Sequence, residues 1–235
     1  MENSENKSLI PTGTSNLAKT VKLLSITQKI LSEIKPQFES VRIGNQEWMT
    51  RNLDVDRFRN GDLIPLIESR EEWKKAGENG QPAWCYYDND PENGKKYGKL
   101  YNWYAVNDPR GLAPEGYHVS TDEEWTILEE FLGGKDIAGH KMKSDNGWAE
   151  WEDEDGEFQN GNGDNSSRFN VLPGGYHGYD GSFGNIRCSA ICWSPSYFPF
   201  SRFLNIYSGN VGRNDTISKQ DGHSVRCLRD NYLSI

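Results

Sequence analysis

Apolar residues between positions 15 and 35 recur at steps of three or four. Leu17, Val21 and Leu24 fall on one stripe, and isoleucines beside them widen it. This spacing places the apolar side chains on one face of an α-helix, which Pro36 ends. An amphipathic helix can pack on its own domain, or it can dock on a partner protein or a second copy of the chain. Both interpretations stay open.

The pattern changes after residue 40. Residues 41–46 alternate between apolar and polar side chains, and Gly44-Asn45 interrupts them. Alternation with a two-residue Gly-Asn break is typical of a β-hairpin. The sequence therefore predicts an N-terminal extension, residues 1–36, followed by one domain, residues 40–231.

Two further segments have the pattern of helices. Residues 69–80 predict a short helix stopped by Gly77 and Gly80. Residues 120–134 predict a second helix, with Ser120 or Thr121 as its cap and acidic residues in its first turn. Between them, residues 82–106 suggest aromatic-rich strand and turn. Residues 145–168 suggest a polar loop, and residues 169–230 suggest short strands with long loops, ending in a strand over 222–227.

The amino-acid composition of the chain disfavours several classes of function. The chain has 35 acidic and 26 basic residues, a net charge of −9, which disfavours binding to nucleic acids or anionic membranes. No apolar run reaches the length of a membrane span, and the polar N-terminus lacks the apolar core of a signal peptide. We therefore expect a cytoplasmic protein, or a secreted one if a leader was removed. Four cysteines are too few for a disulfide scaffold, so buried free thiols are expected.

Four segments occur in a distinctive order: VRIGNQEWMTRNLDV (41–55), PAWCYYDNDPENGKKYGKLYNWYAVNDPRGLAPEGYHVSTDEEW (82–125), LPGGYHG (172–178) and GHSVRCLRD (222–230). Together they resemble the Fibrobacter succinogenes major paralogous domain family. That family is similar to C-type-lectin-like folds and to formylglycine-generating, sulfatase-modifying proteins. The resemblance implies an α+β, C-type-lectin-like domain with two helices beside a twisted, mostly antiparallel sheet and long loops.

The C-terminal part has a second resemblance. LNIYSGNV (204–211) followed by GHSVRC (222–227) is similar to the variable region of proteins diversified by retroelements. In such systems template adenines are mutated, typically at AAC-type codons, and the randomised codons never encode Lys, Glu, Gln, Met or Trp. These five types make up about a fifth of the chain, yet residues 194–218 contain none of them. The resemblance implies a variable surface that binds a protein ligand.

The same segment has the composition of an adaptable binding surface. Aromatic residues give a large contact area, and short polar residues adapt their hydrogen bonds to different ligands. Loops on a rigid scaffold commonly carry recognition. The candidate ligand-binding residues are Ser196, Tyr197, Phe198, Phe200, Ser201, Arg202, Phe203, Asn205, Tyr207, Arg213, Asn214, Asp215 and His223. The alternative is that the alternate aromatic residues fill a core.

This hypothesis separates two groups of side chains. Arg202, Tyr207, Arg213 and Asp215 are expected to face a ligand and to contribute little to stability. Trp193 and Val225 are expected to be core residues of the flanking strands.

Metal chemistry has little support. Residues 88–94 and 152–157 are rich in oxygen ligands, as calcium sites require, but neither has EF-hand spacing. A β-turn and a solvated acidic loop explain them as well, and the sugar-binding signatures of C-type lectins are absent. The four histidines lack metal-ligand spacing; they are His118, expected to be structural, His140, His177 and His223. We expect no metal and no cofactor.

Catalysis also has little support. Cys188 and Cys192 suggest the paired catalytic cysteines of formylglycine-generating enzymes, but positions i and i+4 of a strand lie about 13 Å apart. They are expected to be core strand residues. Three functions remain: a non-catalytic module binding a protein ligand, a cysteine-dependent enzyme, and an interaction component that docks through its N-terminal helix.

Overall fold

The computed structural model of the chain describes residues 38–195 and 198–230. The predicted helix over 15–35 and the candidate site residues Ser196 and Tyr197 lie outside the described residues. The described residues from Glu39 onward belong to one compact unit. No helix among the described residues is both long enough and apolar enough to cross a membrane.

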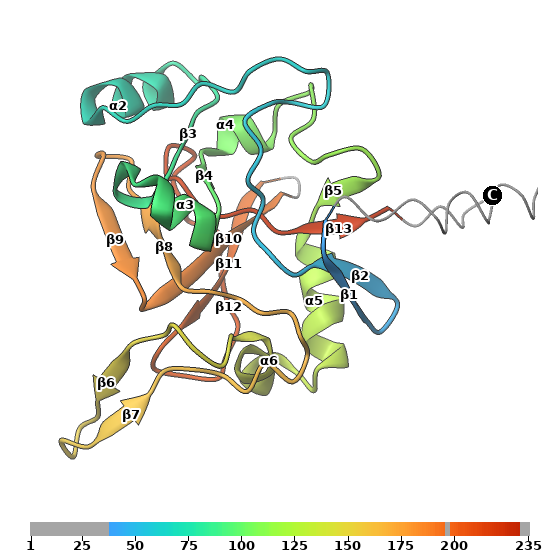
Figure 1. The fold of residues 1–235 in the computed structure, drawn as a ribbon, viewed down its shortest axis with the longest axis vertical. Coiled ribbons are helices and arrows are strands. Elements are labelled where there is room, and N and C mark those ends of the chain that lie inside the picture. The colour runs from blue at the N-terminus through green and yellow to red at the C-terminus, as the bar shows by residue number, and fades with distance from the viewer. Residues whose placement is uncertain (1–37, 196–197, 231–235) are drawn as a thin grey trace, which may run out of the picture. The chain divides into compact units, whose positions relative to one another are not determined.

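One sheet has four strands in the order β1-β2-β13-β5 (Figure 1). They are β1 (Ser40–Ile43), β2 (Gln46–Met49), β13 (Cys227–Arg229) and β5 (Tyr117–Val119). Ile43 lies opposite Gln46, so only two residues form the turn, and Gly44 adopts φ +59° there. The predicted hairpin is therefore confirmed, because glycine readily adopts the left-handed conformation that the turn needs.

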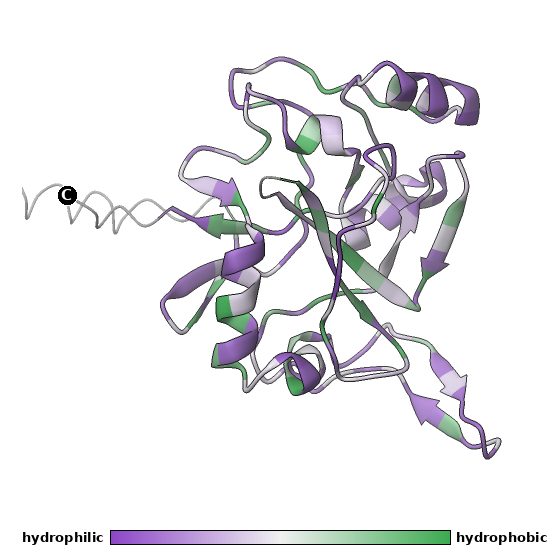
Figure 2. Ribbon diagram, turned by 180° about the vertical axis from the view of Figure 1, so that it is seen from behind, coloured by the Kyte–Doolittle hydropathy of each residue, from purple (hydrophilic) through white to green (hydrophobic). Residues whose placement is uncertain are grey.

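A second sheet has five strands in the order β12-β11-β10-β8-β9. Their bounds are β12 (Gly212–Asn214), β11 (Pro199–Asn205), β10 (Ser189–Pro195), β8 (Gly174–His177) and β9 (Phe183–Ile186). β8 and β10 run parallel, whereas the other pairs are antiparallel. Figure 2 shows apolar residues along the β10 and β11 ribbons, which carry the middle of this sheet.

The described residues also contain five α-helices: α2 (Arg70–Glu78), α3 (Pro91–Tyr97), α4 (Trp103–Val106), α5 (Asp122–Phe131) and α6 (Lys135–Met142). The α+β class is thus confirmed, with more helices than the two predicted. α2 and α5 match the predicted helices, although α2 continues through Gly77 and ends at Glu78. The prediction of strand and turn over 82–106 missed α3. Asp90 caps the first turn of this helix, and Pro91 is the first helical residue.

Short strand pairs complete the fold. β3 (Trp84–Cys85) pairs with β4 (Leu100–Tyr101), and β6 (Glu150–Glu152) pairs with β7 (Phe158–Asn160). The β6–β7 hairpin occupies part of the predicted 145–168 loop and projects from the domain (Figures 1 and 2).

The core joins both sheets to α5. Thr121 caps α5 and forms a capping box with Glu124, which fixes where the helix begins. Trp125 is fully buried, and its ring lies 5.1 Å from that of Trp48 and 5.5 Å from that of Phe169. Tilted and edge-on aromatic pairs of this kind stabilise beyond the area they bury. Packing against the core therefore holds α5 in place beside the five-stranded sheet.

The predicted strand over 222–227 is only partly regular. Gly222 pairs with His177, His223 with Tyr101, and Ser224 with Cys192, as three isolated bridges to different elements. Continuous pairing begins at Cys227. This stretch therefore links the two sheets, because each residue bonds a different neighbour.

Candidate ligand-binding surface

The β10–β11 hairpin is the base of the candidate surface. Its strands pair over their whole length, starting with Ser189 opposite Asn205. Trp193 on β10 is fully buried, and its indole Nε1 donates to the carbonyl oxygen of Tyr101 over 2.7 Å. Residues 194–218, which lack Lys, Glu, Gln, Met and Trp, therefore begin on a fully paired strand.

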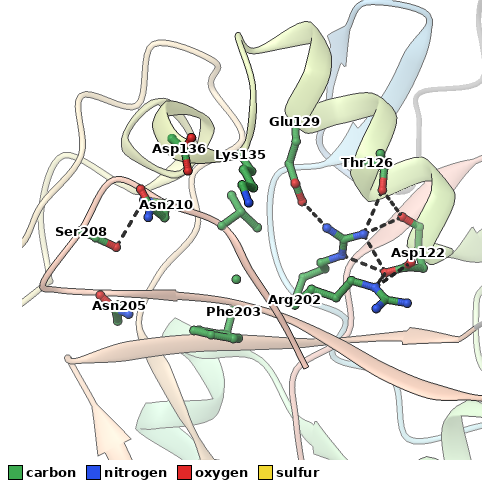
Figure 3. A pocket seen from close by; sticks show the side chains of 13 residues that line it. Asp122, Thr126, Glu129, Lys135, Asp136, Arg202, Phe203, Asn205, Ser208 and Asn210 are labelled. Atoms are coloured by element: carbon green, nitrogen blue, oxygen red, sulfur yellow. Dashed lines mark hydrogen bonds and ion pairs between the residues drawn. The ribbon is translucent and has the colours of Figure 1, made fainter. Parts of the chain in front are cut away.

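Arg202 on β11 is buried against α5, with 4 % of its surface exposed. Its Nη1 donates to Glu129 Oε1 at 2.7 Å, and its Nε and Nη2 donate to Asp122 Oδ1 at 2.9 and 2.7 Å. Nη2 also donates to Thr126 Oγ1 at 2.9 Å (Figure 3). The expectation that Arg202 is an exposed contact with little effect on stability does not fit this arrangement. The side chain joins β11 to α5 because both of its carboxylate partners lie on that helix.

Glu129 is the other buried partner in this network. Only 5 % of its surface is exposed, and burial raises the pKa of its carboxyl group although Arg202 acts in the opposite direction. A buried carboxylate is stable only when paired and hydrogen-bonded. The stability of each of these two buried charges therefore depends on the presence of the other.

Arg213 on β12 is held on two sides but stays partly exposed, at 42 % of its side chain. Its Nε donates to both carboxylate oxygens of Asp122 at 3.0 Å, and its guanidinium carbon lies 4.0 Å from the ring centre of Phe200. Its Nη1 lies 3.8 Å from Asp215. Asp122 thus binds both arginines, and the Arg213 side chain stays partly exposed.

A pocket of about 620 Å³ lies between α5, α6, β11 and the turn that leads into β12 (Figure 3). Ten of its thirteen lining residues are polar or charged, and both signs of charge are present. The lining residues are Asp122, Thr126, Glu129, Lys135, Asp136, Arg202, Phe203, Asn205, Ser208, Asn210, Val211, Gly212 and Arg213.

The predicted site residues divide by exposure. Phe198, Tyr207, Arg213 and Asp215 are exposed, and Phe200, Phe203, Asn205 and Asn214 are half-buried. Arg202, Phe203, Asn205 and Arg213 line the pocket together. Tyr207 lies outside it, with its ring 5.2 Å from that of Trp151 on β6.

Ser201 and His223 are buried, at 1 % and 2 % exposure. The ring of His223 lies 4.6 Å from that of Trp193, and burial lowers its pKa to about 3. Neither ring nitrogen has a hydrogen-bond partner within the described part of the chain. The expectation that Ser201 and His223 face a ligand does not fit this burial.

The sequence did not predict several of the pocket residues. These residues lie on α5, on α6 and in the turn between β11 and β12. Glu129 had a detectable signal, since it falls on the same helical stripe as Trp125, Leu128 and Leu132. An acidic residue within an apolar stripe indicates a buried partner. Lys135 and Asp136 had no such signal.

The cysteines are free thiols in the structure. Cys192 is buried on β10, as predicted for a core strand residue, and burial raises the pKa of its thiol to about 11. Cys188 is half-buried and packs against the same core. A raised pKa opposes formation of the reactive thiolate at Cys192.

The two oxygen-rich segments have local structural roles. Asp90 caps α3 by accepting from the amide of Glu92, and Asp153 accepts from the amides of Asp155 and Glu157 in the β6–β7 turn. Across residues 38–195 and 198–230, no group of three or more His, Cys, Asp or Glu side chains has a metal-binding arrangement.

Comparison with known proteins gives one match. The family model described as the Fibrobacter succinogenes major domain matches residues 41–229, which is most of the chain. No curated protein and no solved structure matches.

Proposed function

This chain belongs to the Fibrobacter succinogenes major domain family, and we propose that it is a non-catalytic, C-type-lectin-like protein that binds a protein ligand. The ligand contacts side chains between residues 198 and 215, on the base formed by β10, β11 and β12. In support of the fold assignment, β5 leads directly into α5, whose Trp125 packs back on the core.

The observation that carries the proposal is the restraint of Arg213. Asp122 binds its Nε and Phe200 lies under its guanidinium, while 42 % of the side chain stays exposed. A side chain already held in one conformation loses less entropy when a partner binds. Arginine is also enriched among the residues that dominate binding energy.

Two exposed aromatic residues precede this arginine along the chain, one on either side of β11. Phe198 is 62 % exposed, before β11, and Tyr207 is 63 % exposed, after it. Their rings offer large contact areas with few rotatable bonds. Together with Arg213, they give the composition of a protein-binding surface.

We further propose that this surface is diversified by a retroelement. Residues 194–218, which lack the five residue types that the randomised codons cannot encode, include β11, β12 and the turn between them. The test is the DNA beside the gene. A reverse transcriptase gene and a near-copy of the 3′ coding region that differs only at adenines would support diversification, and their absence would refute it.

The two alternative functions have weaker support. A cysteine-dependent reaction needs a thiolate, which the raised pKa of Cys192 opposes. Docking through the helix predicted over 15–35 remains a prediction, since that segment lies outside the described residues.

Selection from a random peptide library displayed on phage tests ligand binding with the full-length chain. Peptides selected by the wild type should bind at least about 30-fold more weakly to Arg213→Ala and to Tyr207→Ala. Phe131→Ala is the matched control, because Phe131 is as exposed as Tyr207, at 63 %, but lies on α5. Failure to select any peptide, or equal losses with the control, would refute the proposed binding surface.

A further inference from the structure

The last residue of β11 and the turn that leads to β12, together residues 205–211 and called the 205–211 turn below, are bonded to α6 by main-chain atoms. The amide of His140 donates to the carbonyl of Gly209 over 3.1 Å, and the amide of Val211 donates to the carbonyl of Lys135 over 2.9 Å. Both bonds use groups that every residue except proline has. They do not depend on which side chains the turn carries.

Lys143 directly follows α6 and binds the same turn. Its Nζ donates to the carbonyls of Asn205 and Ser208, both at 3.1 Å, and lies 5.0 Å from the ring centre of Trp148. The residue is 3 % exposed. These acceptors are again main-chain atoms, so the bonds would survive exchange of either side chain.

The Lys143 ammonium has no carboxylate partner within ion-pair distance among the described residues. Burial lowers its pKa to about 8, so it remains mostly charged at neutral pH. An unpaired buried charge is costly, and proteins rarely keep one without a structural or functional reason. Here the charge strengthens two hydrogen bonds to the turn.

Gly139 on α6 permits the close approach of the turn. A Cβ atom at this position would lie 2.6 Å from the carbonyl oxygens of both Gly209 and Asn210. Only glycine therefore lets the helix and the turn meet main chain to main chain.

We propose that α6 and Lys143, the residue after it, fix the shape of the 205–211 turn by bonding only to main-chain atoms of the turn, with Lys143 as the positioning residue. The side chains of Tyr207, Ser208 and Asn210 are then free to differ while the pocket wall keeps its form. Ile206 and Val211 are not, because they are buried at 5 % and 4 % exposure. This inference deepens the proposed function and rests on it, because only a turn that varies in sequence needs such a device. It explains how a variable turn keeps one shape.

Two hydrogen bonds within the turn do use side-chain acceptors. They offer a different explanation for the shape of the turn. Asn205 Oδ1 accepts from the amide of Tyr207, and Ser208 Oγ accepts from the amide of Asn210. If these local bonds fix the turn, replacing the side chains will loosen it. If α6 fixes the turn, it will not.

Amide hydrogen exchange of the full-length chain, followed by NMR at neutral pH without ligand, separates the two cases. The reporters are the amides of Ile206 and Val211, which donate to the main-chain carbonyls of Cys188 and Lys135. In Lys143→Met they should exchange at least about ten-fold faster, because both charge-assisted bonds are lost. Lys143→Arg, which keeps a buried donor, should restore most of the protection.

The triple variant Asn205→Ala, Tyr207→Ala and Ser208→Ala, which removes both local side-chain acceptors, should exchange within about three-fold of the wild type at both reporters. Lys141→Met is the matched control, since Lys141 is a neighbouring lysine that donates to Leu132 instead of to the turn. Fast exchange in the triple variant overturns the inference, as does unchanged exchange in Lys143→Met. If Lys143→Met does not fold, the triple variant alone decides. Because no ligand is used, this outcome is independent of the peptide selection.

Discussion

Arg202 and Glu129 form a buried ion pair in which Nη1 and Oε1 lie 2.7 Å apart and the two side chains are 5 % and 7 % exposed. The pair joins β11 to α5, at the back of the pocket. Arg213, on the next strand, shares Asp122 with Arg202 but is partly exposed, at 42 % of its side chain. Two arginines of one candidate surface therefore have different environments: Arg202 is buried in an ion pair, and Arg213 is partly exposed.

Arg202→Ala should lower the free energy of unfolding by about 3–5 kcal/mol, because Glu129 would remain buried without its partner. Urea denaturation measures the change. Arg213→Ala is the control and should cost about 1 kcal/mol or less, since Arg213 is exposed and Arg202 still binds Asp122. Equal costs for the two variants would contradict this difference between the two arginines.

Trp193→Ala should cost about 3–5 kcal/mol, because it opens a cavity at a fully buried position and removes the hydrogen bond to Tyr101. Tyr207→Ala should cost about 1 kcal/mol or less, the range of one exposed aromatic contact. Thermal unfolding of both variants checks this. A large loss from Tyr207→Ala would make the turn part of the core.

Stability should fall at alkaline pH because of His118. Its ring lies 2.7 Å from both Glu124 and Asp230, and these partners raise its pKa from 6.5 to about 9, against the effect of burial. The folded state holds the proton more tightly than the unfolded state. The stabilisation is therefore complete below about pH 6.5 and is lost as the pH rises through about 9.

The measurement is the urea midpoint of wild type and His118→Gln across that range. Their difference should shrink with rising pH. A constant difference would mean that the His118 proton contributes nothing.

Stability should also fall in acid because of His177 and His223. Burial lowers their pKa values to about 4 and about 3, so the folded state binds these protons less readily than the unfolded state. The penalty begins below about pH 6.5 and grows as the pH falls toward those values. His223→Phe should reduce the acid-dependent loss, measured by thermal unfolding.

His140→Ala is the control for that experiment, because His140 is 55 % exposed. It should follow the wild-type acid profile. An unchanged profile in His223→Phe would show that His223 is not the source of the acid sensitivity.

Gly139→Ala should destabilise the chain by about 1–3 kcal/mol, since the new methyl group would overlap two carbonyl oxygens of the turn. Gly134→Ala tests a different glycine, at φ +101° with open space around its Cβ position, where only backbone strain is expected. Exchange at Val211 should quicken in Gly139→Ala but not in Gly134→Ala. The opposite result would contradict the close packing of α6 on the turn.

The amino-acid sequence was sufficient for features that depend on near neighbours. The turn at Gly44 and the start of α5 each follow from a few adjacent residues, although the choice of Thr121 rather than Ser120 as the cap came from the structure. Local conformational preferences and capping act within one or two turns, so their pattern is readable without the fold. The family resemblance added the α+β class, through motifs distributed over the whole domain.

The roles of the candidate site residues were decided by tertiary structure. Ser201, Arg202 and His223 lie in the same polar and aromatic segment as Arg213, yet they are buried. Arg202 is buried because β11 packs beside Asp122 and Glu129, which lie about 70 to 80 positions earlier on α5. Exposure and charge pairing depend on such distant neighbours, and the periodicity of a short strand covered on both faces does not reveal them.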